Sequence, residues 1–204
     1  LIVLSYTCQS NFEFDRAMEI TDKAYSLENT NPLVLTNLAR LKFGAGYMDE
    51  AMKLIEKAES SLPGNAEIYN LKGFIALARQ HTKESIIIFR KAIELDPTIG
   101  EPHMGLGLAY MRLNDVATAL EEITTAVLLE PQRALFLSYW AKMLYQVDRH
   151  KQAIDILELS HRLDPNDPTP ELYKSIVLRD LNRPTEAIKS LNNAVSLNDN
   201  RAIY

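Results

Sequence analysis

The stretch GEPHMGLGLAYMRLNDVATALEEITTAVLLEPQR, residues 100–133, decides the fold of this chain. Between 103 and 110 its packing positions follow the i, i+3, i+4, i+7 spacing of one helix face. The pattern breaks at 112–115 and resumes as a second helical stripe over 119–127. Pro131 stops the second helix at the preceding residue, because proline has no amide hydrogen to donate and disfavours helical geometry before it. The stretch therefore predicts a helix, a tight turn and a second helix.

The same unit recurs along the chain with a step of 34 residues. Two ladders of small side chains show this step: Ala17, Ala51, Ser85, Ala119, Ala153, Ala187 and Ala24, Ala58, Ala92, Ala126, Ser160, Ala194. A third small ladder and a proline ladder keep it: Ala39, Gly73, Gly107, Ala141, Ser175 and Pro63, Pro97, Pro131, Pro165. Because antiparallel helices approach closely only where neither presents a large side chain, we expect the small residues at helix crossings. The sequence predicts an all-α solenoid of about six such units.

Within 100–133 the order of residue types follows a known repeat pattern. Its members are Leu106-Gly107, Tyr110, Ala119, Ile123, Ala126 and Pro131. In these residues the chain resembles the tetratricopeptide repeat family, and the resemblance covers nearly all of it. His103, in place of the early aromatic, and Trp140, in place of a leucine, depart from the family pattern. The resemblance implies a right-handed superhelix of helix pairs.

We expect one solenoid domain over 1–204, with repeats at approximately 1–31 (partial), 32–65, 66–99, 100–133, 134–167 and 168–201. The first repeat lacks the start of its leading helix, so we expect a fragment of a longer protein. The last part of the sequence, residues 166–204, resembles the late repeats of large bacterial proteins of this family. Its apolar stripe has no polar cap after it, which makes self-association through uncapped ends a further expectation.

Composition narrows the classes of partner. The chain holds 22 Lys and Arg against 27 Asp and Glu, a net charge of −5 with no basic block, so we expect no nucleic-acid ligand. The apolar opening run is too short for a signal-peptide core or a membrane span, so we expect no membrane insertion. The single cysteine, Cys8, cannot form an intramolecular disulfide, and the compartment stays open between cytoplasm and bacterial periplasm.

The sequence offers no catalytic constellation. No two of the four histidines have the i, i+4 spacing of a helical metal pair. Gly105 and Gly107 follow no predicted strand and lack the third glycine of a dinucleotide-binding loop. No nucleophile stands beside a base. We therefore expect no enzyme activity, no cofactor and no metal.

The resemblance assigns the leading helix of each repeat to the concave side, where members of the family bind partners. The residues that this assigns to a partner-binding groove are Arg40, Phe43, Asn70, Phe74, Leu77, Met104, Leu108, Met111, Arg112, Lys142 and Tyr145. Their apolar and methionine-rich centre is typical of a surface for a hydrophobic peptide or helix. The alternative interpretation is that some of them pack against the next repeat.

We therefore predict a non-catalytic scaffold that binds a peptide or helix of another protein. The alternative is a substrate-recruiting or regulatory arm of a larger enzyme, such as a glycosyltransferase or a peptidase. Members of the family that bind acidic chaperone termini carry a Lys/Asn clamp on successive leading helices. Thr36 with Arg40 and Asn70 with Phe74 stand at clamp positions here, which disfavours co-chaperone activity.

Overall fold

The computed structural model describes residues 1–10 and 13–199. Within these ranges the chain forms twelve helices and no strand. The helices are α1 (Ile2–Ser10), α2 (Phe14–Leu27), α3 (Pro32–Gly44), α4 (Met48–Ser61), α5 (Ala66–Ala78), α6 (Thr82–Leu95), α7 (Gly100–Arg112), α8 (Val116–Leu129), α9 (Ala134–Gln146), α10 (His150–Leu163), α11 (Thr169–Asp180) and α12 (Pro184–Asp199).

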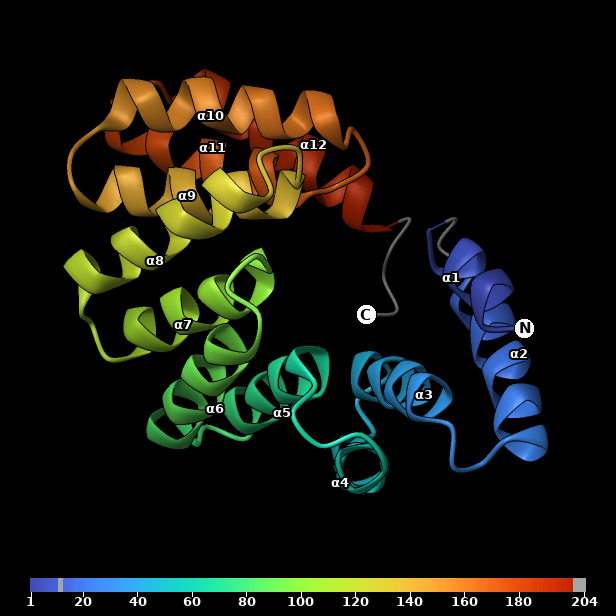
Figure 1. Ribbon diagram of the computed structural model, residues 1–204. Coiled ribbons are helices and arrows are strands. Elements are labelled where there is room, and N and C mark those ends of the chain that lie inside the picture. Colours follow the sequence, from blue (N-terminus) through green and yellow to red (C-terminus); the bar gives the residue numbers. More distant parts are fainter. Residues whose placement is uncertain (11–12, 200–204) are drawn as a thin grey trace. The chain divides into compact units, whose positions relative to one another are not determined.

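Each predicted repeat holds one helix pair, and the two helices of a pair pack against each other (Figure 1). We call the first helix of each pair the leading helix and the second the following helix. Within 1–97 and within 98–204 each following helix also packs against the next leading helix, as α2 does against α3 and α8 against α9. The expected all-α solenoid of helix pairs is confirmed.

The chain divides into two compact units, Leu1–Pro97 and Thr98–Tyr204. The first unit contains α1 to α6 and the second contains α7 to α12. The boundary falls two residues before the end of the third predicted repeat, 66–99. A single domain over 1–204 stays a prediction.

Small residues make close helix crossings possible inside each pair. A methyl group added at Gly107 on α7 would lie 2.4 Å from Cγ1 of Ile123 on α8. At Gly73 on α5 the same addition would lie 2.6 Å from Cε1 of Phe89 on α6. Ile123 and Phe89 are fully buried. The missing side chain of the glycine therefore makes room for a large apolar side chain of the following helix.

The turns inside the pairs repeat with the same period as the helices. Residues with a left-handed backbone lie one period apart at Gly46, Gln80, Asn114, Asp148 and Asn182. In the turn after α7, the amide of Asn114 donates to the Met111 carbonyl (3.1 Å) and the amide of Asp115 donates to the Tyr110 carbonyl (3.0 Å). These two bonds form a Schellman motif, which satisfies the last carbonyls of the leading helix. Glycine, asparagine and aspartate tolerate this conformation best, which explains most members of the ladder.

The crossing of the first pair is polar. Ser5 on α1 and Thr21 on α2 are fully buried with their hydroxyl oxygens 2.7 Å apart. The amide nitrogen of Asn37 on α3 donates to the Ser5 hydroxyl (3.0 Å) and the Thr21 hydroxyl (3.2 Å). Gln9 donates to Asn37 Oδ1 at 2.9 Å. Four side chains thus satisfy one another's hydrogen-bonding groups at this crossing.

Candidate functional site

The predicted groove residues all lie on leading helices. Two are on α3, three on α5, four on α7 and two on α9: Arg40 and Phe43; Asn70, Phe74 and Leu77; Met104, Leu108, Met111 and Arg112; Lys142 and Tyr145. The first five belong to the first unit and the other six to the second.

In the first unit, two of the predicted residues are buried and two are partly buried. Asn70 is 2% exposed and Leu77 is 5% exposed, so their side chains pack within the unit. Phe74 is partly buried and lies edge-on to Phe89, with ring centroids 5.0 Å apart. Phe43 packs against the core formed by α3, α4 and α5. The apolar part of the predicted surface is thus partly shared with the core.

Arg40 is the charged member of the predicted set in the first unit. Its guanidinium donates to Glu67 Oε1 at 2.8 Å, which joins α3 to α5. Both side chains are about a third exposed, at 31% and 39%, so the ion pair is screened by solvent. The positive charge of Arg40 is therefore balanced within the chain.

In the second unit, the α7 residues range from buried to exposed. Met104 is 3% exposed and belongs to the core that includes Ile123. Leu108 and Met111 are partly buried against the same core. Arg112 is exposed at the end of α7. Leu108, Met111 and Arg112 therefore retain accessible surface on the leading helix.

Lys142 on α9 has an aromatic environment. Its ammonium lies over the ring of Tyr173 on α11, 5.4 Å from the ring centroid. The Tyr173 ring is in turn packed edge-on against Tyr139, with centroids 6.0 Å apart. Burial lowers the pKa of Lys142, because desolvation disfavours the charged ammonium. Burial also raises the pKa of Tyr173, and the neighbouring Tyr139 adds to this shift.

Tyr145, one turn further along α9, is held by α11. Its hydroxyl donates to Asp180 Oδ2, and Arg179 Nε donates to Asp180 Oδ1 at 2.8 Å. The hydrogen bond from Tyr145 has the largest effect on Asp180, followed by that from Arg179, and both lower the pKa of the carboxyl group. The Tyr145 ring also lies 5.4 Å from the ring of His150. Tyr145 therefore contributes a fixed aromatic face to the leading-helix surface.

Tyr139 and Tyr173 were not among the predicted site residues. They lie 34 residues apart and thus form a rung of the repeat, a signal that the sequence contains. The corresponding positions in the earlier repeats are Val3, Asn37, Leu71 and Gly105, so the aromatic pair is confined to the last two repeats. Together with Lys142 they form what we call the Lys142 cluster.

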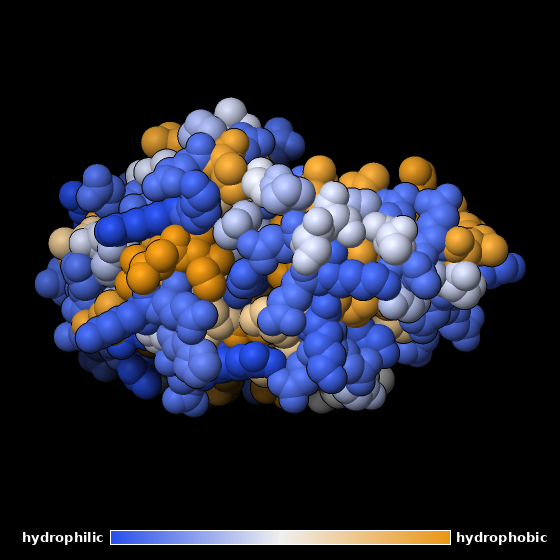
Figure 2. All heavy atoms as spheres, turned by 60° about the horizontal axis from the view of Figure 1, so that its bottom comes forward, coloured by the Kyte–Doolittle hydropathy of each residue, from blue (hydrophilic) through white to orange (hydrophobic). Residues whose placement is uncertain are grey.

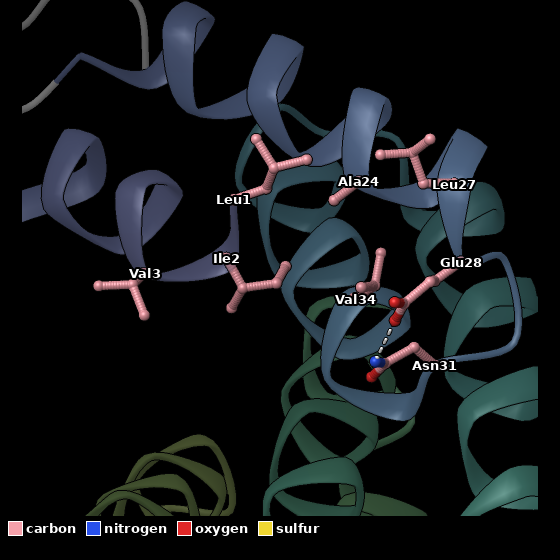
Figure 3. Close-up of a pocket in the computed structure, with 8 residues that line it drawn as sticks. All are labelled: Leu1, Ile2, Val3, Ala24, Leu27, Glu28, Asn31 and Val34. Atoms are coloured by element: carbon pink, nitrogen blue, oxygen red, sulfur yellow. Dashed lines mark hydrogen bonds between the residues drawn. The ribbon is translucent and has the colours of Figure 1, made fainter.

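Two apolar hollows lie away from these residues. One, of about 380 Å³, is lined by residues of α1 to α3 and their connections, where Asn31 Nδ2 donates to Glu28 Oε2 at 2.7 Å (Figure 3). The other, of about 360 Å³, lies between α11 and α12 and includes Leu172 and Leu191. On the face shown in Figure 2, apolar side chains emerge as separate groups on a largely hydrophilic surface.

The described part of the chain contains no cluster of three or more His, Cys, Asp or Glu side chains that could hold a metal ion. His103 Nδ1 instead lies 2.7 Å from Glu122 Oε2, which ties α7 to α8. Among the described helices, none has both the length and the apolar character that a membrane crossing requires.

Similarity to known proteins agrees with this architecture. Profiles described as tetratricopeptide repeat match residues 10–73, 66–99 and 104–168, together well over half of the chain. Superkiller complex protein 3 of Mus musculus is 33% identical over 97 residues, which are 47% of this chain and 6% of that protein. The chain thus spans a small fraction of the length of this relative.

Among solved structures, the Cut9–Hcn1 hetero-tetramer of the APC/C matches with a TM-score of 0.86 at 16% identity, covering 98% of this chain and 40% of that one. YrrB, a repeat protein described as having an unusual peptide-binding site, matches with a TM-score of 0.58 at 18% identity, covering 91% of this chain and 96% of that one. At these identities the likeness concerns the fold. Proteins with this fold are generally interaction scaffolds and are typically non-catalytic. The chain belongs to the tetratricopeptide repeat family.

Proposed function

We propose that this chain is a scaffold whose leading helices hold a peptide or a helix of a partner protein. The observation that carries the proposal is that Leu108, Met111, Lys142 and Tyr145 keep accessible surface on α7 and α9 of one unit. Methionine and aromatic side chains are enriched at binding surfaces, because they offer deformable or rigid contact area at low entropic cost.

The buried members of the predicted groove fit a supporting role in this proposal. Asn70, Leu77 and Met104 are each at most 5% exposed, so they offer a partner little contact area. Their side chains instead fix the positions of the helices that present the exposed residues. YrrB, whose description names a peptide-binding site, gives a precedent for peptide binding on this fold.

Site-specific photo-crosslinking tests the proposal without deleting a core side chain. A photoreactive phenylalanine analogue replaces Met111 or Tyr145 on leading helices. As matched controls it replaces Ile87 on α6 or Leu128 on α8, which are 70% and 76% exposed on following helices. The chain is then illuminated in an extract of its source cells.

We expect Met111 and Tyr145 to yield a common crosslinked protein that Ile87 and Leu128 do not yield. Crosslinks of equal strength from all four positions, or from the controls alone, would contradict the proposal. Circular dichroism of each variant checks that its helix content is unchanged.

A further inference from the structure

Lys142 differs from the other partly buried lysines of the chain. Lys42, Lys72 and Lys174 each pair with a carboxylate, at 3.0, 2.7 and 3.0 Å, and Lys57 reaches the hydroxyl of Tyr25. Among the residues that the structure describes, Lys142 has no carboxylate within ion-pair distance and no hydrogen-bond acceptor. Its ammonium lies over the face of the Tyr173 ring.

Asp167 is an acidic group whose charge acts on Tyr173 of this cluster, and its carboxylate already accepts hydrogen bonds. Asp167 raises the pKa of Tyr173 by its charge, but its Oδ1 accepts hydrogen bonds from the amide (2.9 Å) and hydroxyl (2.6 Å) of Thr169. These bonds hold the carboxylate in the turn before α11. Lys142 therefore keeps an unbalanced positive charge on the leading-helix surface.

The equivalent positions one, two and three repeats earlier show that this charge is not required by the fold. Lys142 corresponds to Leu108, Phe74 and Arg40 at successive steps of the repeat. Leu108 and Phe74 are apolar, and the charge of Arg40 is balanced by Glu67 at 2.8 Å. A partly desolvated cation without a counter-ion costs free energy, which a ligand carboxylate would recover.

We propose that Lys142 binds a carboxylate of the partner, and that the partner segment carries an aspartate or glutamate flanked by apolar side chains. Charge complementarity identifies the acidic group, and the rings of Tyr139 and Tyr173 provide apolar surface for its neighbours. The assignment rests on the proposed function, since it specifies what the same surface selects. A single Lys on an aromatic face differs from the Lys/Asn clamp, which this chain lacks.

A displayed library of random short peptides provides the probe. The 204-residue chain is the bait, and the selections are repeated with Lys142→Met and with Lys151→Met, which removes a charge from an exposed position on α10. Selected peptides are labelled, and their Kd values are measured by fluorescence anisotropy before and after their acidic residue is changed to the matching amide.

The unchanged chain and Lys151→Met should enrich acidic residues between apolar ones, and Lys142→Met should not. The Glu→Gln change in the peptide should weaken binding to the unchanged chain about tenfold and leave binding to Lys142→Met unaltered. If Lys142→Met does not fold, the Glu→Gln change in the peptide still tests the assignment on the unchanged chain. An unaltered Kd for the changed peptide would overturn the role of Lys142.

Two other results distinguish this assignment from the proposed function. Peptides that crosslink to Tyr145 but show no acidic preference would overturn the role of Lys142 and leave the scaffold function standing. Failure to select any peptide that crosslinks to Tyr145 or Met111 would overturn both.

Discussion

The first helix pair and the fourth pair occupy the same place in the repeat but join their helices with opposite chemistry. In the fourth pair, Gly107 on α7 leaves room for the fully buried Ile123 on α8. In the first pair, the equivalent residues are Ser5 and Thr21, whose hydroxyls lie 2.7 Å apart. The comparison teaches that the repeat fixes the size of the side chains at a crossing more strictly than their polarity.

The two crossings should respond differently to substitution. The apolar crossing depends on the volume of Ile123, and a smaller side chain there leaves a cavity. The polar crossing depends on mutual hydrogen bonds, and removing one partner leaves buried polar groups unsatisfied. Stability measurements on matched variants of the two pairs therefore separate the effect of volume from that of hydrogen bonding.

The largest expected effect comes from emptying the apolar crossing. Ile123→Ala should destabilise the second unit by about 2–5 kcal/mol, because the side chain is fully buried and its removal leaves a cavity that the surroundings fill only in part. Urea unfolding followed by circular dichroism measures the loss. The equivalent change in the first pair, Thr21→Ala, should cost less, and an equal or larger cost would contradict the comparison.

The next largest effect on stability is expected from adding a side chain at the same crossing. Gly107→Ala places a methyl group 2.4 Å from Ile123 Cγ1 and 3.3 Å from the Ala119 carbonyl oxygen, so the Ile123 side chain or one of the two helices must shift. We expect a loss of about 1–3 kcal/mol, reduced somewhat by the higher helix propensity of alanine. The double variant with Ile123→Val should recover part of this loss. Additive losses in the double variant would show that the two side chains do not share the crossing.

Breaking the polar crossing should have a comparable or smaller effect. Asn37→Leu removes the donor to Ser5 and Thr21 and the acceptor for Gln9, at an expected cost of about 1–3 kcal/mol. Adding Ser5→Ala, Gln9→Phe and Thr21→Ile copies the residues of the next repeat, Ala39, Phe43 and Ile55.

This fourfold variant should regain the lost stability, because no buried polar group is left without a partner. Thermal unfolding of the single and the fourfold variants checks this order. A fourfold variant less stable than Asn37→Leu would mean that the polar network, and not the volume of its residues, determines how the first two repeats pack.

The smallest effect is expected at the Lys142 cluster. Lys142→Met removes an unbalanced, partly buried charge and keeps a side chain of similar length, so the free energy of unfolding should change by no more than about 0.5 kcal/mol. The lost contact with the Tyr173 ring offsets the relief of desolvation. A large decrease in the melting temperature would show that Lys142 stabilises the fold, and it would contradict the proposal that its charge serves to bind the partner.

The sequence predicts most of this architecture because the period of 34 residues is carried by packing. Small residues such as Gly107 and prolines such as Pro131 have physical reasons to recur, so their spacing locates each helix pair. The depth of burial along a leading helix was harder to predict. Met104 and Leu77 are 3% and 5% exposed, and the repeat position alone does not determine this degree of burial.

The hydrogen bonds of the polar crossing and the surroundings of Lys142 could not be predicted from the sequence, because they depend on contacts between different repeats. Ser5 was recognisable as a small residue, but its hydrogen bonds depend on Gln9 and on Asn37 of the next repeat. Lys142 was assigned to the groove by its repeat position, whereas the absence of a described counter-ion depends on where Asp167 and its partner Thr169 lie. Such contacts join different repeats and vary with each neighbour.

Hydrogen–deuterium exchange of the chain, alone and bound to a peptide selected by it, tests the central claim most directly. The account predicts slower exchange on binding in the leading helices α7 and α9, with no change in the following helices α8 and α10. Protection confined to α8 and α10 would contradict it, because the partner would then lie on the opposite helices of each pair.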